Sequence, residues 1–119
     1  HPMKTWTEWQ QEERRLMGKE DENHQKRRAV QQLQEAYDTH LRQGLRFVEE
    51  VSWQFRKNDR AFLREQTQER VFSLSRSTQA HFETMEETLR QEKRDLEEQL
   101  NEVAYGKRKA SLDKQEANP

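Results

Sequence analysis

The sequence predicts an all-α protein, an antiparallel hairpin of two long helices that pack in the manner of a coiled coil. Good helix formers such as Glu, Gln, Arg, Lys and Leu dominate the 119 residues, and strong helix breakers are few. Hydrophobic residues make up 29% of the chain and charged residues 38%. This apolar fraction is too low for a compact layered core, but it suits long helices that each bury one narrow stripe.

We expect the first helix of the hairpin over residues 5–57. The run Thr5-Trp6-Thr7-Glu8 matches a capping box, which marks a helix start. Further along, apolar residues recur at spacings of three, four and their sum: Val30, Leu33, Tyr37, Leu41, Val48, Val51 and Phe55. The segment from Met17 to Ala29 has no large apolar residue between its ends, so it is either a solvated helix or a segment that orders on a partner. We favour the solvated helix.

The chain is expected to reverse near Asn58-Asp59, close to the middle of the helical region. Asn tolerates the left-handed conformation that ends a helix, and Asp59 can then act as the N-cap of a second helix. Two other bends stay open, at Gly44 and in the serine-rich segment 73–78. A straight dimeric coiled coil is a further alternative.

The second helix is expected over residues 60–112. Its apolar stripe consists of Phe82, Met85, Leu89, Leu96, Leu100 and Val103. Gly106 precedes Lys-Arg-Lys and indicates a helix end or a fraying point there. We expect residues 1–4 to be a disordered start, with His1 and Pro2 derived from a vector, and residues 113–119 to be a disordered tail.

Nothing in the sequence points to an enzyme, a metal or a cofactor. There is no cysteine, and His24, His40 and His81 are isolated from one another, without metal-ligand spacing. Glycine-rich phosphate loops and nucleophile motifs are absent, and no apolar run approaches a membrane span. The net charge is −1, and acids stand near both basic clusters, residues 26–28 and 107–109. Nucleic-acid binding is therefore not favoured.

The aromatic residues are the best candidates for binding a partner. Most are expected to fill the seam between the helices, and Trp53 and Phe55 are expected to pack the closed end of the hairpin. Some would stay exposed as anchors, because tryptophan is favoured at binding hot spots. The candidates are Trp6, Trp9, Trp53, Phe55 and Phe62. We expect Trp6 and Trp9 to be the main anchors, since they lie beyond the polar stretch.

Two stretches of the chain carry a resemblance to a known group. "LRQEKRDLEEQLNEVAYGKRKASL" (residues 89–112) resembles the small helical proteins encoded beside LXG toxins in type VII secretion loci of Gram-positive bacteria. "FVEEVSWQFRKNDRAFLREQTQE" (residues 47–69) has the same character, and a hairpin with aromatics at its bend looks like the WXG-type (ESX-like) proteins. The Trp-x-Gly signature is absent, because Gln54 and Phe55 follow Trp53. Phe55 and Asp59 have the spacing of a Phe-x-x-x-Asp export motif, but they stand in mid-chain.

The resemblance implies a targeting factor or chaperone that binds the helical N-terminal LXG domain of a toxin, often beside a second small helical protein. It implies a cytoplasmic protein and leaves open whether the protein leaves the cell with its cargo. Two alternatives remain: a homodimeric coiled-coil scaffold or adaptor, and a nucleic-acid-associated regulator that uses the basic clusters.

Overall fold

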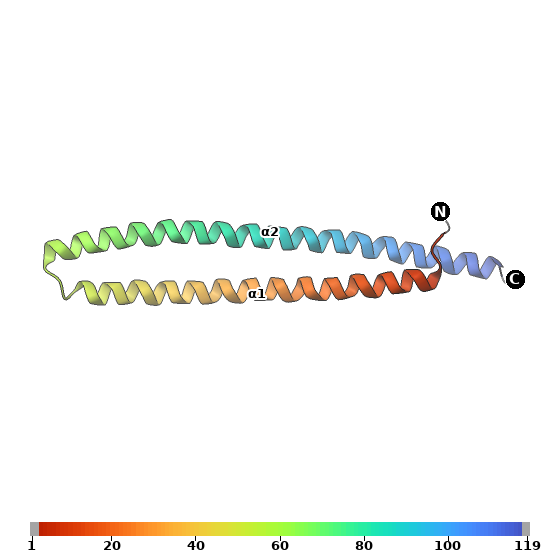
Figure 1. The fold of residues 1–119 in the computed structure, drawn as a ribbon, viewed down its shortest axis with the longest axis horizontal. Coiled ribbons are helices and arrows are strands. Elements are labelled where there is room, and N and C mark those ends of the chain that lie inside the picture. Colours follow the sequence, from red (N-terminus) through yellow and green to blue (C-terminus); the bar gives the residue numbers. More distant parts are fainter. Residues whose placement is uncertain (1–2, 118–119) are drawn as a thin grey trace. The chain divides into compact units, whose positions relative to one another are not determined.

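The computed structural model describes residues 3–117, and within that range it contains two α-helices and no strand (Figure 1). Helix α1 spans Trp6–Ser52 and helix α2 spans Lys57–Ala117. The all-α hairpin predicted from the sequence is therefore confirmed. The chain divides into two compact units. We call residues 1–27 with 87–119 the terminal unit, and residues 28–86 the turn unit.

Helix α1 begins at the predicted capping box. The backbone N–H of Glu8 donates to the Thr5 hydroxyl at 3.2 Å, and the N–H of Trp9 donates to the Thr5 carbonyl at 3.0 Å. Thr5 is thus the N-cap residue, and its hydroxyl satisfies one of the N–H groups that the first turn of a helix leaves unpaired.

In the terminal unit, the two helices pack antiparallel along a heptad seam. Leu16 of α1 and Leu96 and Val103 of α2 form the buried cluster, against which Trp9 and Leu100 pack. The seven-residue intervals from Trp9 to Leu16 and from Leu96 to Val103 keep these side chains on facing stripes. The predicted stripe of the second helix is therefore confirmed in this unit.

The polar stretch of α1 is helical, and it also takes part in the seam. Asn23 lies one heptad after Leu16 and is almost fully buried. Its Nδ2 donates to the Leu89 carbonyl at 2.9 Å and to Glu92 Oε1 at 3.2 Å, while Arg27 Nε donates to its Oδ1 at 3.0 Å. These bonds compensate for the burial of the amide. The seam thus crosses this stretch through a polar layer, so a purely solvated helix is not what forms.

The turn unit has a thinner seam. Phe82 is buried and meets the Tyr37 ring edge-on, with ring centroids 6.1 Å apart. Most other apolar seam residues are half-buried, and α2 places small polar residues such as Ser75 and Thr78 among them. Three residues that we expected in the apolar stripes are instead exposed: Leu33, Phe55 and Met85. Leu33 and Met85 lie to one side of the seam, and Phe55 lies in the turn.

The chain reverses at residues 53–56, a few residues before the predicted position. The N–H groups of Gln54 and Phe55 donate to the carbonyls of Val51 and Ser52, at 3.0 and 3.1 Å. Asn58 and Asp59 belong to the first turn of α2, so Asp59 is not its N-cap. The carbonyl of Arg56 accepts the first helical bond, from the Arg60 N–H at 2.8 Å, and Asp59 is placed where a carboxylate interacts favourably with the helix dipole.

The predicted bounds of both helices are corrected as well. Helix α1 ends at Ser52 rather than at residue 57, and α2 begins at Lys57 rather than at residue 60. Gly106 does not end α2, which continues through residues 113–117 of the expected tail. Residues 1–2, predicted to be vector-derived, and residues 118–119, the end of the predicted tail, lie outside the described range.

Candidate partner-binding site

The candidate aromatics near the turn are exposed. The relative accessibility is 61% for Trp53, 47% for Phe55 and 63% for Phe62. The prediction that Trp53 and Phe55 pack the closed end of the hairpin is therefore wrong. Neither ring is buried between the helices, so both leave apolar surface exposed.

Arginines of α2 hold the turn in shape. The Arg60 side chain donates to the carbonyls of Ser52 at 3.2 Å and Phe55 at 3.1 Å, and its guanidinium lies 4.3 Å from the centroid of the Trp53 ring. Arg64 lies 5.6 Å from the same ring and pairs with Glu49 at 3.2 Å. Arg60 thus donates to the carbonyl of Ser52, the last residue of α1, and to that of Phe55 in the turn, and it fixes Trp53 through a cation–π contact.

The two N-terminal tryptophans have different surroundings. Trp9 packs on the buried cluster of the terminal unit, and its indole lies directly on Gly106. Trp6 is 44% exposed, and the Lys107 ammonium lies 4.9 Å from its ring centroid. Trp9 is therefore mainly a seam residue, whereas Trp6 keeps the exposure that an anchor requires.

Lys107 connects the two helices beside Trp6. Its Nζ is hydrogen-bonded to Gln10 Oε1 and lies 3.4 Å from Glu13 Oε2, with both charged side chains largely covered. One predicted basic cluster therefore contributes a lysine that is already used within the fold. This makes it less available to an acidic partner.

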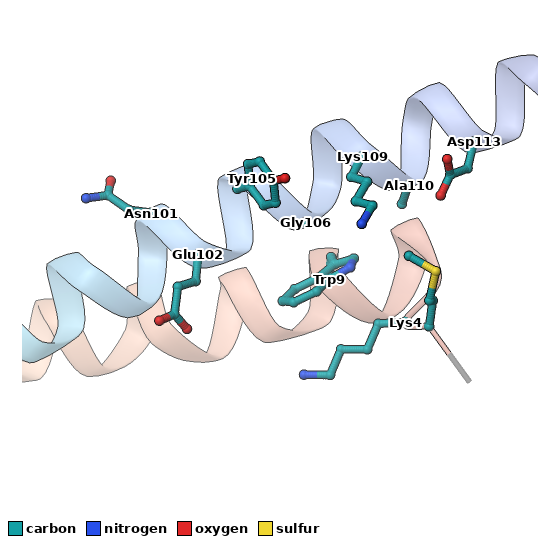
Figure 2. Close-up of a pocket in the computed structure, with 10 residues that line it drawn as sticks. Lys4, Trp9, Asn101, Glu102, Tyr105, Gly106, Lys109, Ala110 and Asp113 are labelled. Atoms are coloured by element: carbon teal, nitrogen blue, oxygen red, sulfur yellow. The ribbon is translucent and has the colours of Figure 1, made fainter. Parts of the chain in front are cut away.

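A pocket of about 570 Å³ opens beside Trp9 in the terminal unit (Figure 2). Its apolar lining comes from Met3, Trp9, Tyr105, Gly106 and Ala110, and its polar lining from Lys4, Asn101, Glu102, Lys109 and Asp113. The Lys4 ammonium lies 4.7 Å from the centroid of the Trp9 ring. The pocket could receive an apolar side chain, with the indole as its floor.

One ion pair on α1 has shifted pKa values. The hydrogen bond from Arg15 lowers the pKa of Glu12 below its ordinary value, and the same bond raises the pKa of Arg15. Both side chains lie on the outside of α1, where such pairs are structural. Among residues 3–114, whose side chains the structure describes, there is no cluster of His, Asp or Glu side chains that could hold a metal ion. Over that range neither helix is long and apolar enough to cross a membrane.

A comparison with models of protein families identifies the family of the chain. The model of the family described as "Protein of unknown function (DUF3958)" matches residues 5–110. The chain belongs to the DUF3958 family. No curated protein and no solved structure gives a significant match. The match of this DUF3958 chain covers nearly all of α1 and α2, so the family corresponds to the two-helix fold itself.

Sequence reasoning missed the pocket beside Trp9. Gly106 was interpreted as a helix end or a fraying point, although the heptad spacing from Leu96 and Val103 continues to Ala110, which is half-buried. That continuation was the available signal that Gly106 lies inside the helix. Nothing in the sequence indicated that Trp9 would pack on Gly106, because this contact depends on the register between the two helices and joins residues that are 97 positions apart.

Proposed function

We propose that this DUF3958 protein is a non-enzymatic interaction protein that binds the helical N-terminal domain of an LXG toxin as a targeting factor or chaperone for type VII secretion. One observation carries the proposal. Within the turn unit, all of which is described, Phe82 is the one large apolar side chain classed as buried. Eight others are exposed: Leu33, Phe47, Trp53, Phe55, Phe62, Phe72, Leu74 and Met85.

The energetic consequence favours a partner. Burying one large apolar side chain stabilises a protein by about 1.5–3 kcal/mol. The turn unit gains little of this stabilisation, because most of its large apolar side chains are exposed. Long amphipathic helices obtain most of their stability from packing. Helices from another protein would cover one side of this surface and stabilise the hairpin in the same step.

The kind of partner follows from the chemistry of the surface and from the resemblance. Exposed aromatics beside arginines, as at Trp53, are typical of protein-binding hot spots. Extended helices accept other helices along their grooves. The resemblance of residues 47–69 and 89–112 to proteins encoded beside LXG toxins supports the LXG domain as the specific partner, with a second small helical protein as an additional member of the complex.

Co-expression tests the proposal. The chain would be produced with the tagged N-terminal domain of a candidate LXG toxin, taken from the genes beside its own, and the eluate examined by size-exclusion chromatography with light scattering. We expect a stable complex containing both chains. A tight homodimer that ignores the toxin domain would support the scaffold alternative instead, and salt-sensitive binding to DNA would support the regulator. Detecting the chain in culture supernatant with the toxin would establish co-export.

A further inference from the structure

The two sides of α1 in the turn unit differ sharply in charge. At 100° per residue, one side of the helix next to the seam carries Ala29, Leu33, Ala36, His40, Gly44, Phe47 and Val51. The other side carries Arg28, Gln31, Glu35, Asp38, Arg42, Arg46 and Glu49. None of the first seven is Asp, Glu, Lys or Arg, whereas six of the second seven are. A helix that was merely solvated on both sides would have no reason for this asymmetry.

Helix α2 shows a matching side. The corresponding arc contains Leu63, Gln66, Arg70, Leu74, Ser77, His81 and Thr84, with Met85 at its edge toward the seam. Leu63, Leu74 and Met85 are spaced by eleven residues, which is close to three helical turns, so they lie nearly in line. Arg70 is the single full charge in this arc.

These two arcs lie on the same side of the seam. The Glu49–Arg64 ion pair joins the helices on the charged side of α1, and a hollow lined by Leu45, Val48, Glu49, Arg64, Thr67 and Gln68 lies there as well. In an antiparallel pair of helices, residues at the same angle from the seam face the same side of the pair. The arcs of α1 and α2 therefore share one side. We call the combined arcs, from residues 29–51 and 63–85, the neutral flank.

Large apolar side chains stand exposed along the neutral flank. Leu33 and Phe47 come from α1, and Leu74 and Met85 come from α2. Gly44 lies among them, and a Cβ built on it would meet nothing within 4 Å, so the hairpin itself does not require a glycine there. Gly44, Ala29 and Ala36 leave space for another helix to approach the backbone of α1.

We propose that the neutral flank is the surface on which one amphipathic helix of the LXG domain docks, lying lengthwise against both α1 and α2. This inference rests on the proposed function and adds the place and the chemistry of the contact. Residues 29–51 extend over about 33 Å at 1.5 Å per residue, which fits a partner helix of roughly 20–25 residues. Its contact stripe carries aliphatic residues at heptad spacing and no charge away from Arg70, because elsewhere on this flank a buried charge would lack a partner.

The composition of the flank argues against other classes of occupant. Nucleic acid and anionic membranes are bound by clustered Lys and Arg, and Arg70 stands alone here. A second copy of the chain would present the same neutral chemistry, so it is the competing occupant that an experiment has to distinguish.

A pair of phenylalanines allows a matched test. Phe47 on the neutral flank is 65% exposed, and Phe72 on the opposite side of the turn unit is 59% exposed. Each is replaced by Glu in the full chain, and affinity for the N-terminal domain of the neighbouring LXG toxin is measured by calorimetry, with helicity and melting followed by circular dichroism. Leu74→Glu provides a second neutral-flank variant.

We expect F47E and L74E to weaken binding by about 30-fold or more, the loss typical of a hot-spot side chain, while F72E stays within about threefold of wild type. All three variants should melt near the wild-type temperature, because the replaced side chains are exposed. If wild type binds and F47E and L74E bind equally well, the flank assignment is overturned although the proposed function stands. If wild type does not bind the domain, the proposed function fails as well. A wild-type homodimer that F47E dissociates, and that persists in the presence of the domain, overturns the partner helix as the occupant.

Discussion

The indole of Trp9 lies so close to Gly106 that a Cβ on that glycine would stand 2.3 Å from Cε2 of the ring. The two residues come from opposite helices of the terminal unit, and the ring occupies the space that a side chain at position 106 would need. Glycine is normally a poor residue within a helix, costing about 0.5–1 kcal/mol relative to alanine. Here the close approach of a flat aromatic ring supplies the reason for it.

Gly106→Ala should therefore destabilise the protein, although alanine is the better helix former. The methyl group would force the indole out of its position, and overpacking of this kind typically costs about 1–3 kcal/mol. The measurement is the free energy of unfolding in urea. Gly18→Ala is the matched control, because a Cβ there meets nothing within 4 Å, and it should stabilise by about 0.5–1 kcal/mol. Equal stabilisation by both changes would refute the contact.

Removing the buried amide of Asn23 should also cost stability. Asn23→Ala leaves the Leu89 carbonyl, Glu92 and Arg27 without their shared partner, and loss of a buried hydrogen-bonding group costs about 1–3 kcal/mol. A double-mutant cycle with Arg27→Ala checks this, because residues in one network should give a clearly non-additive result. Additive effects would mean that the two side chains act independently.

The turn should depend on Arg60 more than on Arg64. Arg60→Ala removes the donor to the Ser52 and Phe55 carbonyls together with the closer cation–π contact, so we expect a loss of about 1–2 kcal/mol and a change in Trp53 fluorescence. Arg64→Ala breaks an exposed ion pair, which is worth at most about 1 kcal/mol. A larger effect from Arg64 than from Arg60 would contradict this account of the turn.

The Glu12–Arg15 pair predicts a pH dependence. The pKa of Glu12 is held below its ordinary value of 4.5 by the hydrogen bond from Arg15. A carboxyl whose pKa is lower in the folded state stabilises the protein above pH 4.5 and loses that contribution as the pH falls through the lowered pKa. An NMR titration of Glu12 should show this low pKa, and Arg15→Gln should raise it toward 4.5. An unchanged titration in the variant would exclude Arg15 as the cause.

Periodicity and capping were enough to predict the fold class, the start of α1 and much of the seam of α2. Thr5 was recognisable because the capping box is a local signal, and Leu96 and Val103 because the heptad is regular there. These features depend on residues within one or two helical turns of one another. Such features can therefore be predicted without knowledge of the tertiary structure.

What escaped prediction depends on contacts between the helices. The turn lies at residues 53–56, which contain no glycine or proline that could have marked it. It is held by Arg60, whose side chain donates to the carbonyls of Ser52 and Phe55. Asn23 looked like part of a solvated stretch, and its burial becomes visible only opposite Leu89. Trp9 was predicted to be an exposed anchor and lies on Gly106 instead. In each case the deciding partner is remote along the chain or carries no local signal.

The central claim is that the exposed apolar surface of this two-helix protein is completed by the helices of an LXG domain. Calorimetric titration of the chain with that domain at several temperatures tests it most directly. We predict saturable binding with a negative heat-capacity change, which is the mark of apolar surface leaving water. The claim would be contradicted if no heat of binding were detected at any temperature and if mixing changed neither the molecular mass of the species in solution nor the helicity of the chain.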